Sequence, residues 1–286
     1  MSSPRTPGAA EDVPAANRYL EPRSLPRRLR HQRRDLIWRA RLRFGSVYGR
    51  RDAATRPDPA CPELAVGAVA MGDKYADWCL TMITSLRDRG AYQGPIYVIT
   101  DLPELFEPLD NVVVVHAPPA GNRLIAKGCK QVLMHYVSEP VFLYLDSDLV
   151  VASPLAAWYE TMKPALATWP LLCYSNDKPV DNAYHGGVVL VDMKRGMPIV
   201  ERWEKVVRSG RWQSDQTCLY SVAGPDGPGH FPDTGFILLR YLFDGAGAEA
   251  CIVHVTNKVI REYPREEVQR YLSQELGVTR LPQSFD

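Results

Sequence analysis

A series of short apolar runs, separated by helical patterns, constrains the fold of this chain more than any other feature of its sequence. Each run is apolar or β-branched at nearly every position, which is typical of strands that are covered on both faces of a sheet. Strands that alternate with helices in this way predict a mostly parallel sheet flanked by helices, a Rossmann-like α/β fold. The expected strands are 64–71, 95–100, 111–116 and 140–145, and the expected helices are 78–89 and 123–137.

The pattern is weaker in the second half of the chain, where the predicted elements are less regularly spaced. A chain of 286 residues, 45% of them hydrophobic, can still bury one large core, and an α/β chain of this length is usually a single domain. We expect strands at 187–192, 236–239 and 251–255, a helix at 198–209 and a loop at 224–229.

The first 60 residues differ in composition from the rest. Residues 1–20 are expected to be disordered, whereas 23–51 hold eleven arginines and a single acidic residue. Apolar residues recur on one side of a predicted basic amphipathic helix over 25–47. We expect a partly disordered arm at 1–60 and one folded domain over 61–286. Three roles stay open for the helix: contact with an anionic membrane surface, docking of an acidic acceptor, or packing on the domain.

The six cysteines include no CxxC pair and no spacing typical of a zinc site. They are expected to be small buried residues in a reducing compartment. The first residues lack the apolar core of a secretory signal, and no run of about 18 apolar residues could span a membrane. We therefore expect a cytoplasmic protein, with peripheral contact at the inner membrane face as an option for the arm, and no nucleic-acid partner.

Two aspartates, Asp146 and Asp148, directly follow the predicted strand 140–145. Ligands of open α/β sheets bind at the carboxyl ends of the strands, and hard oxygen ligands suit Mn²⁺ or Mg²⁺. A DxD pattern alone is common, and a solvated turn would also produce it. Here it interrupts an apolar segment over 141–151, where two charges are costly without a counter-charge. The position therefore favours a divalent-metal site.

The segment VFLYLDSDLVV resembles the DxD region of the retaining GT-A glycosyltransferases of family 8, the glycogenin and bacterial galactosyltransferase group, over about 64–260. The resemblance implies a GT-A fold in which Asp146 and Asp148 bind Mn²⁺ (or Mg²⁺) together with a late histidine, here His254. The metal bridges the diphosphate of a nucleotide-sugar donor, and Ser147 lies in the same donor site. The family's later lysine corresponds to Lys258, although the glycine that usually precedes it is missing.

Other matches imply further donor-binding residues. Ala70 and Tyr75 resemble the first strand and turn, where the nucleotide base is held, but Gly72 and Lys74 replace the usual acidic and asparagine residues. A lysine of the helix before the DxD contacts the donor in the family, and Lys127 fits it, with a rival one turn further on at 130.

Two segments of the second half complete the implied site. His185 replaces an asparagine that contacts the donor sugar, and Gly187 follows where the backbone can approach a ligand. Asp215 and Gln216 match a DQ pair beside the anomeric carbon. The resemblance therefore implies catalytic roles for His185 and Asp215 and donor-binding roles for Gly187 and Gln216.

The function implied is metal-dependent transfer of a hexose from a nucleotide-sugar, expected to be a UDP-sugar, to an unknown acceptor with retention of configuration. Asp215 as nucleophile and acceptor attack on the leaving-group face both stay open. The alternatives are a sugar-phosphate nucleotidyltransferase, a DxD phosphatase of the haloacid-dehalogenase type, and a binding protein without catalysis. The sequence does not identify the sugar, the base, the acceptor or the oligomeric state.

Overall fold

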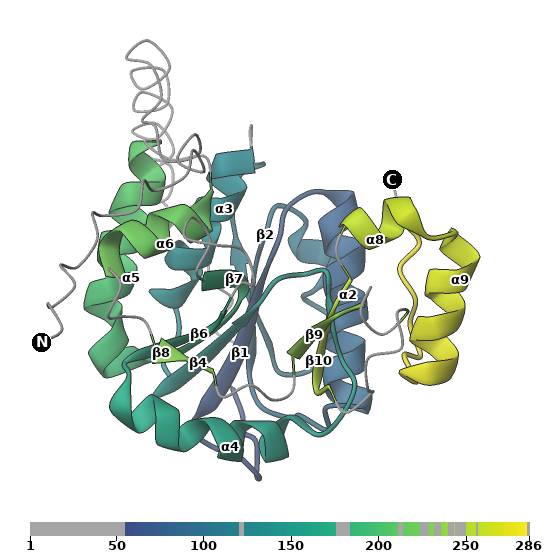
Figure 1. Cartoon of the computed structure of the whole chain (residues 1–286), viewed down its shortest axis with the longest axis horizontal. Coiled ribbons are helices and arrows are strands. Elements are labelled where there is room, and N and C mark those ends of the chain that lie inside the picture. Colours follow the sequence, from purple (N-terminus) through teal and green to yellow (C-terminus); the bar gives the residue numbers. More distant parts are fainter. Residues whose placement is uncertain are drawn as a thin grey trace, which may run out of the picture.

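The structure is a computed structural model (Figure 1). It describes residues 55–284, apart from 120–122, 176–183, 211–213, 224–228, 232–235, 240–242, 244–249 and 256. The predicted arm with its basic helix over 25–47, and the membrane contact expected of it, lie outside the described residues. Within the described part, no helix combines the length and apolar character needed to cross a bilayer.

A seven-stranded sheet forms the centre of the fold (Figure 1). Its strands are parallel except β7, which runs antiparallel to both of its neighbours. This confirms the prediction of a mostly parallel α/β sheet. In spatial order the strands are β3 (Val112–His116), β2 (Ile96–Thr100), β1 (Leu64–Ala70), β4 (Val141–Leu145), β7 (Tyr184–Asp192), β6 (Leu171–Ser175) and β8 (Gly229–His230).

Helices cover both faces of this sheet, which explains why its strands are apolar without alternation. The apolar cluster on one face joins β1 and β4 to α2 (Asp73–Asp88) and α4 (Leu155–Thr168). The cluster on the other face joins the strands to α3 (Arg123–Met134), α5 (Met193–Ser209) and α6 (Asp215–Ala223). All six cysteines are buried and unpaired, as the sequence predicted.

A second, three-stranded sheet lies beside the first and positions the site. Its order is β5 (Leu149–Val151), β10 (Ile252–His254) and β9 (Phe236–Leu238), with β5 antiparallel to β10. A third apolar cluster joins this sheet to the outer side of α2 and to the C-terminal helices, seen at the right of Figure 1. Those helices are α8 (Asn257–Glu262), α9 (Arg265–Arg270) and a π-helical turn (Tyr271–Glu275).

Several predicted boundaries were wrong. Helix α2 begins at Asp73 rather than at residue 78, after Gly72, whose φ of 79° lies in the left-handed region. Helix α5 begins at Met193 rather than at 198, because the carboxylate of Asp192 accepts hydrogen bonds from two backbone N–H groups of the first turn. Strand β7 begins at Tyr184 rather than at 187, and Gly229, expected in a loop, belongs to β8. Elements β5, α4 and β6 had not been predicted.

Gly67 in β1 provides a test of the packing between β1 and its two neighbouring strands. A Cβ atom at this position would lie 2.5 Å from the ring of Phe142 and 2.9 Å from the carbonyl oxygen of Tyr97. We expect Gly67→Ala to lower the free energy of unfolding by about 1–3 kcal/mol. The matched control is Gly128→Ala in α3, where the nearest atom would be 3.9 Å away and alanine should stabilise the helix by about 0.5–1 kcal/mol. Urea unfolding measures both, and equal stabilities for the two variants would contradict the packing described.

Candidate functional site

The site begins where the chain leaves the central sheet at the end of β4. Up to Leu145 the strand pairs with β7, and the backbone N–H of Asp146 still donates to the carbonyl oxygen of Gly187 at 2.7 Å. The chain then turns, with the N–H of Leu149 donating to the carbonyl oxygen of Asp146 at 3.3 Å, and enters β5 of the small sheet. The two aspartates therefore sit at a turn between two fully buried strands.

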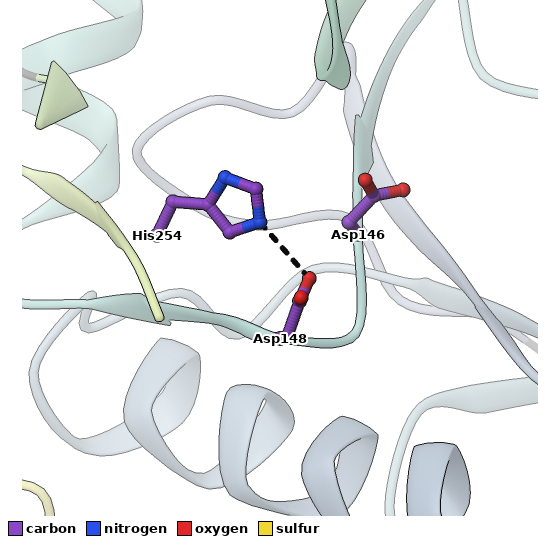
Figure 2. Close-up of side chains that lie close together, drawn as sticks. All are labelled: Asp146, Asp148 and His254. Carbon is purple, nitrogen blue, oxygen red and sulfur yellow. Dashed lines mark hydrogen bonds and ion pairs between the residues drawn. The ribbon is translucent and has the colours of Figure 1, made fainter. Parts of the chain in front are cut away.

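Strand β10 brings His254 to this turn. In the antiparallel register of β5 and β10, His254 lies opposite Leu149, the residue that follows Asp148. The N–H of Val255 donates to the carbonyl oxygen of Asp148 at 2.9 Å, which extends the pairing to the turn. The imidazole Nε2 consequently lies 3.1 Å from Oδ1 of Asp148 (Figure 2).

Asp146, Asp148 and His254 form a cluster that could hold a metal ion. Each offers a ligand atom, and the three atoms lie within 4.8 Å of one another. Two carboxylates and an imidazole are a donor set that suits a divalent cation such as Mn²⁺. Figure 2 shows the side chains converging from the β4–β5 turn and from β10. The structure thus brings together the three residues that the sequence named as metal ligands.

The electrostatics of this cluster favour positive charge. Burial acts to lower the pKa of His254, but the carboxylates of Asp148 and Asp146 outweigh it and raise that pKa above its usual value. Burial acts to raise the pKa of Asp148, but the neighbouring imidazole of His254 holds it below its usual range. A cation is therefore favoured at the point where these side chains meet.

His185 stands directly behind His254. Its Nε2 lies 3.2 Å from Nδ1 of His254, and the two rings meet edge to face at a centroid distance of 4.9 Å. Its Nδ1 accepts a hydrogen bond from the backbone N–H of Gly187 at 3.2 Å. Burial, and then the charges of His254 and Lys130, lower the pKa of His185 to about 3. The ring is therefore a neutral group inside the site.

Gly187 is packed between His185 and Asp146. A Cβ atom there would lie 2.7 Å from Cε1 of His185 and 2.8 Å from Oδ2 of Asp146. Only glycine fits without displacing one of these side chains. The structure shows that this glycine makes room for two neighbouring side chains, and the expected approach of its backbone to a ligand stays a prediction.

A second charged cluster adjoins the first. Asp215 lies at the start of α6. Its carboxylate accepts hydrogen bonds from Nζ of Lys127 on Oδ1 and from Nζ of Lys130 on Oδ2, both at 2.9 Å. Burial acts to raise the pKa of Asp215, but the charges of Lys130 and Lys127 hold it below its usual range. Both carboxylate oxygens are thus engaged by ammonium groups.

Lys130 links the two clusters. It is only 3% exposed, and its Nζ lies 3.4 Å from Oδ1 of Asp146 and 2.5 Å from the carbonyl oxygen of Gly186. It also lies 4.4 Å from the ring centre of Tyr144, whose hydroxyl donates to Asp146 at 2.7 Å. Burial acts to lower the pKa of Lys130, but Asp146 and Asp215 raise it above its usual value. The lysine therefore remains charged in the interior.

The sequence had favoured Lys127 over Lys130 for the helix lysine of the site. Both contact Asp215, but Lys130 alone of the two has an ion pair with Asp146. The signal that could have identified it is its setting, because Lys130 is the one charged residue in the segment 128–134. A charge surrounded by apolar residues on a helix is expected to have a buried partner.

The remaining predicted residues lie around these clusters. Ala70 is buried at the carboxyl end of β1, next to β4 in the sheet, and Tyr75 in the first turn of α2 is 40% exposed. Ser147 is buried in the turn, and Gln216 is half-buried in α6. Lys258 belongs to α8, and its side chain lies outside what the structure describes.

One residue near Tyr75 had not been singled out from the sequence. The carboxylate of Asp101, at the end of β2, accepts a hydrogen bond from the backbone N–H of Gly72 at 2.7 Å. This bond ties the end of β2 to the turn that starts α2. An aspartate directly after a predicted strand at the same edge of the sheet was the available signal.

Comparisons with known proteins give a likeness in structure. No protein-family model matches the sequence, and the search of curated proteins found no match. Among solved structures, galactosyltransferase LgtC in complex with donor and acceptor sugar analogues superimposes with a TM-score of 0.57 at 14% identity. That match covers 77% of this chain and 98% of the LgtC chain.

Glycosyltransferase GlyE of Streptococcus pneumoniae gives a similar result. One structure has a TM-score of 0.53 at 18% identity, covering 77% of this chain and 65% of that chain. Its apo form has a TM-score of 0.51 at 19% identity, covering 68% of this chain and 54% of that chain. The chain thus spans two thirds or less of GlyE. Together with the mostly parallel sheet and its flanking helices, these likenesses confirm the predicted GT-A fold.

Proposed function

We propose that this chain is a metal-dependent glycosyltransferase that moves a hexose from a nucleotide-sugar to an acceptor. The observation that carries the proposal is the convergence of Asp146, Asp148 and His254 at the end of a central strand of a GT-A fold. The LgtC structure of the same fold holds analogues of a donor and an acceptor sugar. A UDP-sugar donor and retention of configuration follow from the resemblance to family 8.

The three clustered side chains would hold Mn²⁺ or Mg²⁺. When bound, the ion supplies a Lewis acid that stabilises negative charge on the departing nucleoside diphosphate. Lys130 keeps a fixed positive charge beside Asp146 and holds the adjoining backbone through the Gly186 carbonyl. Lys258, in α8 shortly after His254, is proposed to add positive charge toward the diphosphate.

Asp215 is proposed to position groups at the donor sugar instead of attacking it. Each of its oxygens already accepts from an ammonium group, and the side chain is 8% exposed. A carboxylate whose pKa is strongly depressed by two cations is a weak nucleophile. We therefore favour acceptor attack on the face of the departing diphosphate, with Gln216 beside Asp215 at the sugar.

The nucleotide is proposed to lie along the carboxyl ends of β1 and β4, where ligands of open α/β sheets bind. Ala70 and the exposed ring of Tyr75 would contact the base there, and Ser147 and Gly187 would border the diphosphate and the sugar. Division of the chain into an arm over 1–60 and a catalytic domain over 61–286 remains a prediction, as does contact of 25–47 with the inner face of a membrane.

Replacement of the clustered aspartates tests the metal site. We expect Asp146→Asn and Asp148→Asn each to reduce metal-dependent turnover of the donor by on the order of 10²–10³-fold, because the charge that retains the cation is lost. Initial rates with Mn²⁺ and with EDTA measure the effect. Asp110→Asn, which removes a charge from an exposed ion pair with Arg56, is the matched control. Wild-type rates in the Asp146 and Asp148 variants would refute the assignment.

A thermal-shift screen with Mn²⁺ and a panel of UDP- and GDP-sugars should identify the donor. A ligand present at about 100 times its Kd stabilises the folded state by about 2.7 kcal/mol. We expect a UDP-sugar added with Mn²⁺ to raise the Tm above the value with Mn²⁺ alone, and GDP-sugars to give no such further rise. A shift that is equal across all nucleotide sugars, or absent for all of them, would contradict the donor proposed.

The two helix lysines are expected to differ in their contribution to stability. Lys130→Met leaves Asp146 without its ammonium partner and Asp215 with one instead of two, so we expect a loss of about 3 kcal/mol or more. Lys127 is 24% exposed at its side chain, and Lys127→Met should cost about 1 kcal/mol or less. Urea unfolding of the two variants compares them directly. If Lys127→Met lowers the free energy of unfolding more than Lys130→Met does, the assignment of Lys130 as the residue that links the two clusters is wrong.

A further inference from the structure

The pair formed by His185 and His254 has a defined direction of hydrogen bonding. A backbone N–H can only donate, so the bond from Gly187 requires a lone pair on Nδ1 of His185. Because Nδ1 carries no hydrogen, the hydrogen of the ring is on Nε2, which faces Nδ1 of His254 at 3.2 Å. Nδ1 of His254 is therefore the acceptor of this bond, which leaves the hydrogen of the ring on Nε2, directed at Asp148 at 3.1 Å.

This arrangement of hydrogens bears on metal binding. A histidine binds a metal through an unprotonated nitrogen, and its other nitrogen usually donates to a partner that fixes the ring. Nε2 of His254 is the atom directed at the carboxylates, so a ligating His254 must carry its hydrogen on Nδ1, facing His185. The partner at this position is an imidazole, which can either donate or accept.

We propose that His185 is a positioning residue for His254 that sets the metal affinity of the Asp146–Asp148–His254 cluster. The inference rests on the proposed function, because it assumes that this cluster holds the metal. The hydrogen on Nε2 of His185 moves to Nδ1 of His254, the hydrogen on Nε2 of His254 leaves to water, and water supplies one to Nδ1 of His185. Each ring carries one hydrogen before and after, so no net charge is created.

The exchange has a structural cost and a structural benefit. Once Nδ1 of His185 carries a hydrogen, the N–H of Gly187 loses its acceptor. In return, Nε2 of His185 accepts from His254 and holds that ring with its free nitrogen toward the carboxylates. With a side chain at 185 that can accept a hydrogen bond without this exchange, the cluster should bind the metal at least as tightly as in the wild type. With an apolar side chain at 185, the cluster should bind the metal less tightly.

Binding of Mn²⁺ alone to the full chain at fixed pH tests this, with free Mn²⁺ measured by electron paramagnetic resonance. We expect His185→Leu to raise the Kd by about 10–100-fold. His185→Gln, whose carboxamide oxygen reaches about as far as Nε2, should keep the wild-type Kd within about threefold or lower it. His135→Leu is the control, because His135, directly after α3, pairs with Glu204 of α5 in a partly exposed contact and its loss should leave the Kd unchanged.

A metal-free measurement keeps the inference testable if His185→Leu fails to fold. In the ¹⁵N spectrum of the metal-free wild type, the rings of His185 and His254 should both carry their hydrogen on Nε2. Addition of Mg²⁺, a diamagnetic substitute for Mn²⁺, should move the hydrogen of His254 to Nδ1. A wild-type Kd for His185→Leu, or a hydrogen on Nδ1 of His185 in the metal-free chain, overturns this inference alone. Absence of Mn²⁺ binding by the wild type overturns the metal site and the proposed function as well.

Discussion

The site depends on the antiparallel pairing of β5 with β10. The DxD turn leads the chain out of the central sheet, and the next strand must satisfy its backbone hydrogen bonds in another sheet. Because β10 supplies that pairing, His254 is held opposite Leu149 and next to Asp148, although more than one hundred positions separate the two in sequence. A shift of one residue in this register would turn the imidazole to the other face of the small sheet. The metal cluster is therefore a consequence of strand register as much as of residue identity.

Several carboxylates lie close together at the edge of the central sheet, where their mutual repulsion and desolvation are unfavourable. Neighbouring positive charges compensate for this. Lys130 is placed on the inner side of α3, where it reaches Asp146 and Asp215 at once. Asp215 is buried and Asp146 is partly exposed, and each has an ammonium partner, so the buried carboxylate avoids the penalty of an isolated charge in the interior. The same lysine holds the Gly186 carbonyl and thereby connects α3 to β7. The contacts that neutralise the carboxylates are thus also the contacts that fix the backbone around them.

The sequence predicted most of the first half of the fold because its strands are short, uniformly apolar and separated by regular helices. It missed β5, because a run of three residues does not differ in pattern from the adjoining turn. It also missed β6, although that strand has five residues like β2, β3 and β4. It named the three clustered residues through motif order, yet no local pattern shows that β10 pairs with β5. It favoured Lys127 over Lys130 for donor contact, which stays a prediction, and it did not show that Lys130 is the lysine that pairs with Asp146, since helical spacing alone does not show which lysine faces the sheet. It gave no indication that His185 would contact His254, a pairing that exists only through the packing of β7 beside the small sheet.

Glycine at 187 leaves room for the histidine at 185. The resemblance places an asparagine at 185, whereas the imidazole of this chain extends into the space between β7 and the DxD turn. That space is where the Cβ of residue 187 would lie, 2.7 Å from the imidazole and 2.8 Å from Asp146. The histidine, the glycine and the aspartate therefore form one packing unit, in which a larger residue at 187 would displace a metal-cluster side chain. This coupling makes the identity of residue 185 part of the geometry of the cluster, in addition to any contact that it makes with a sugar.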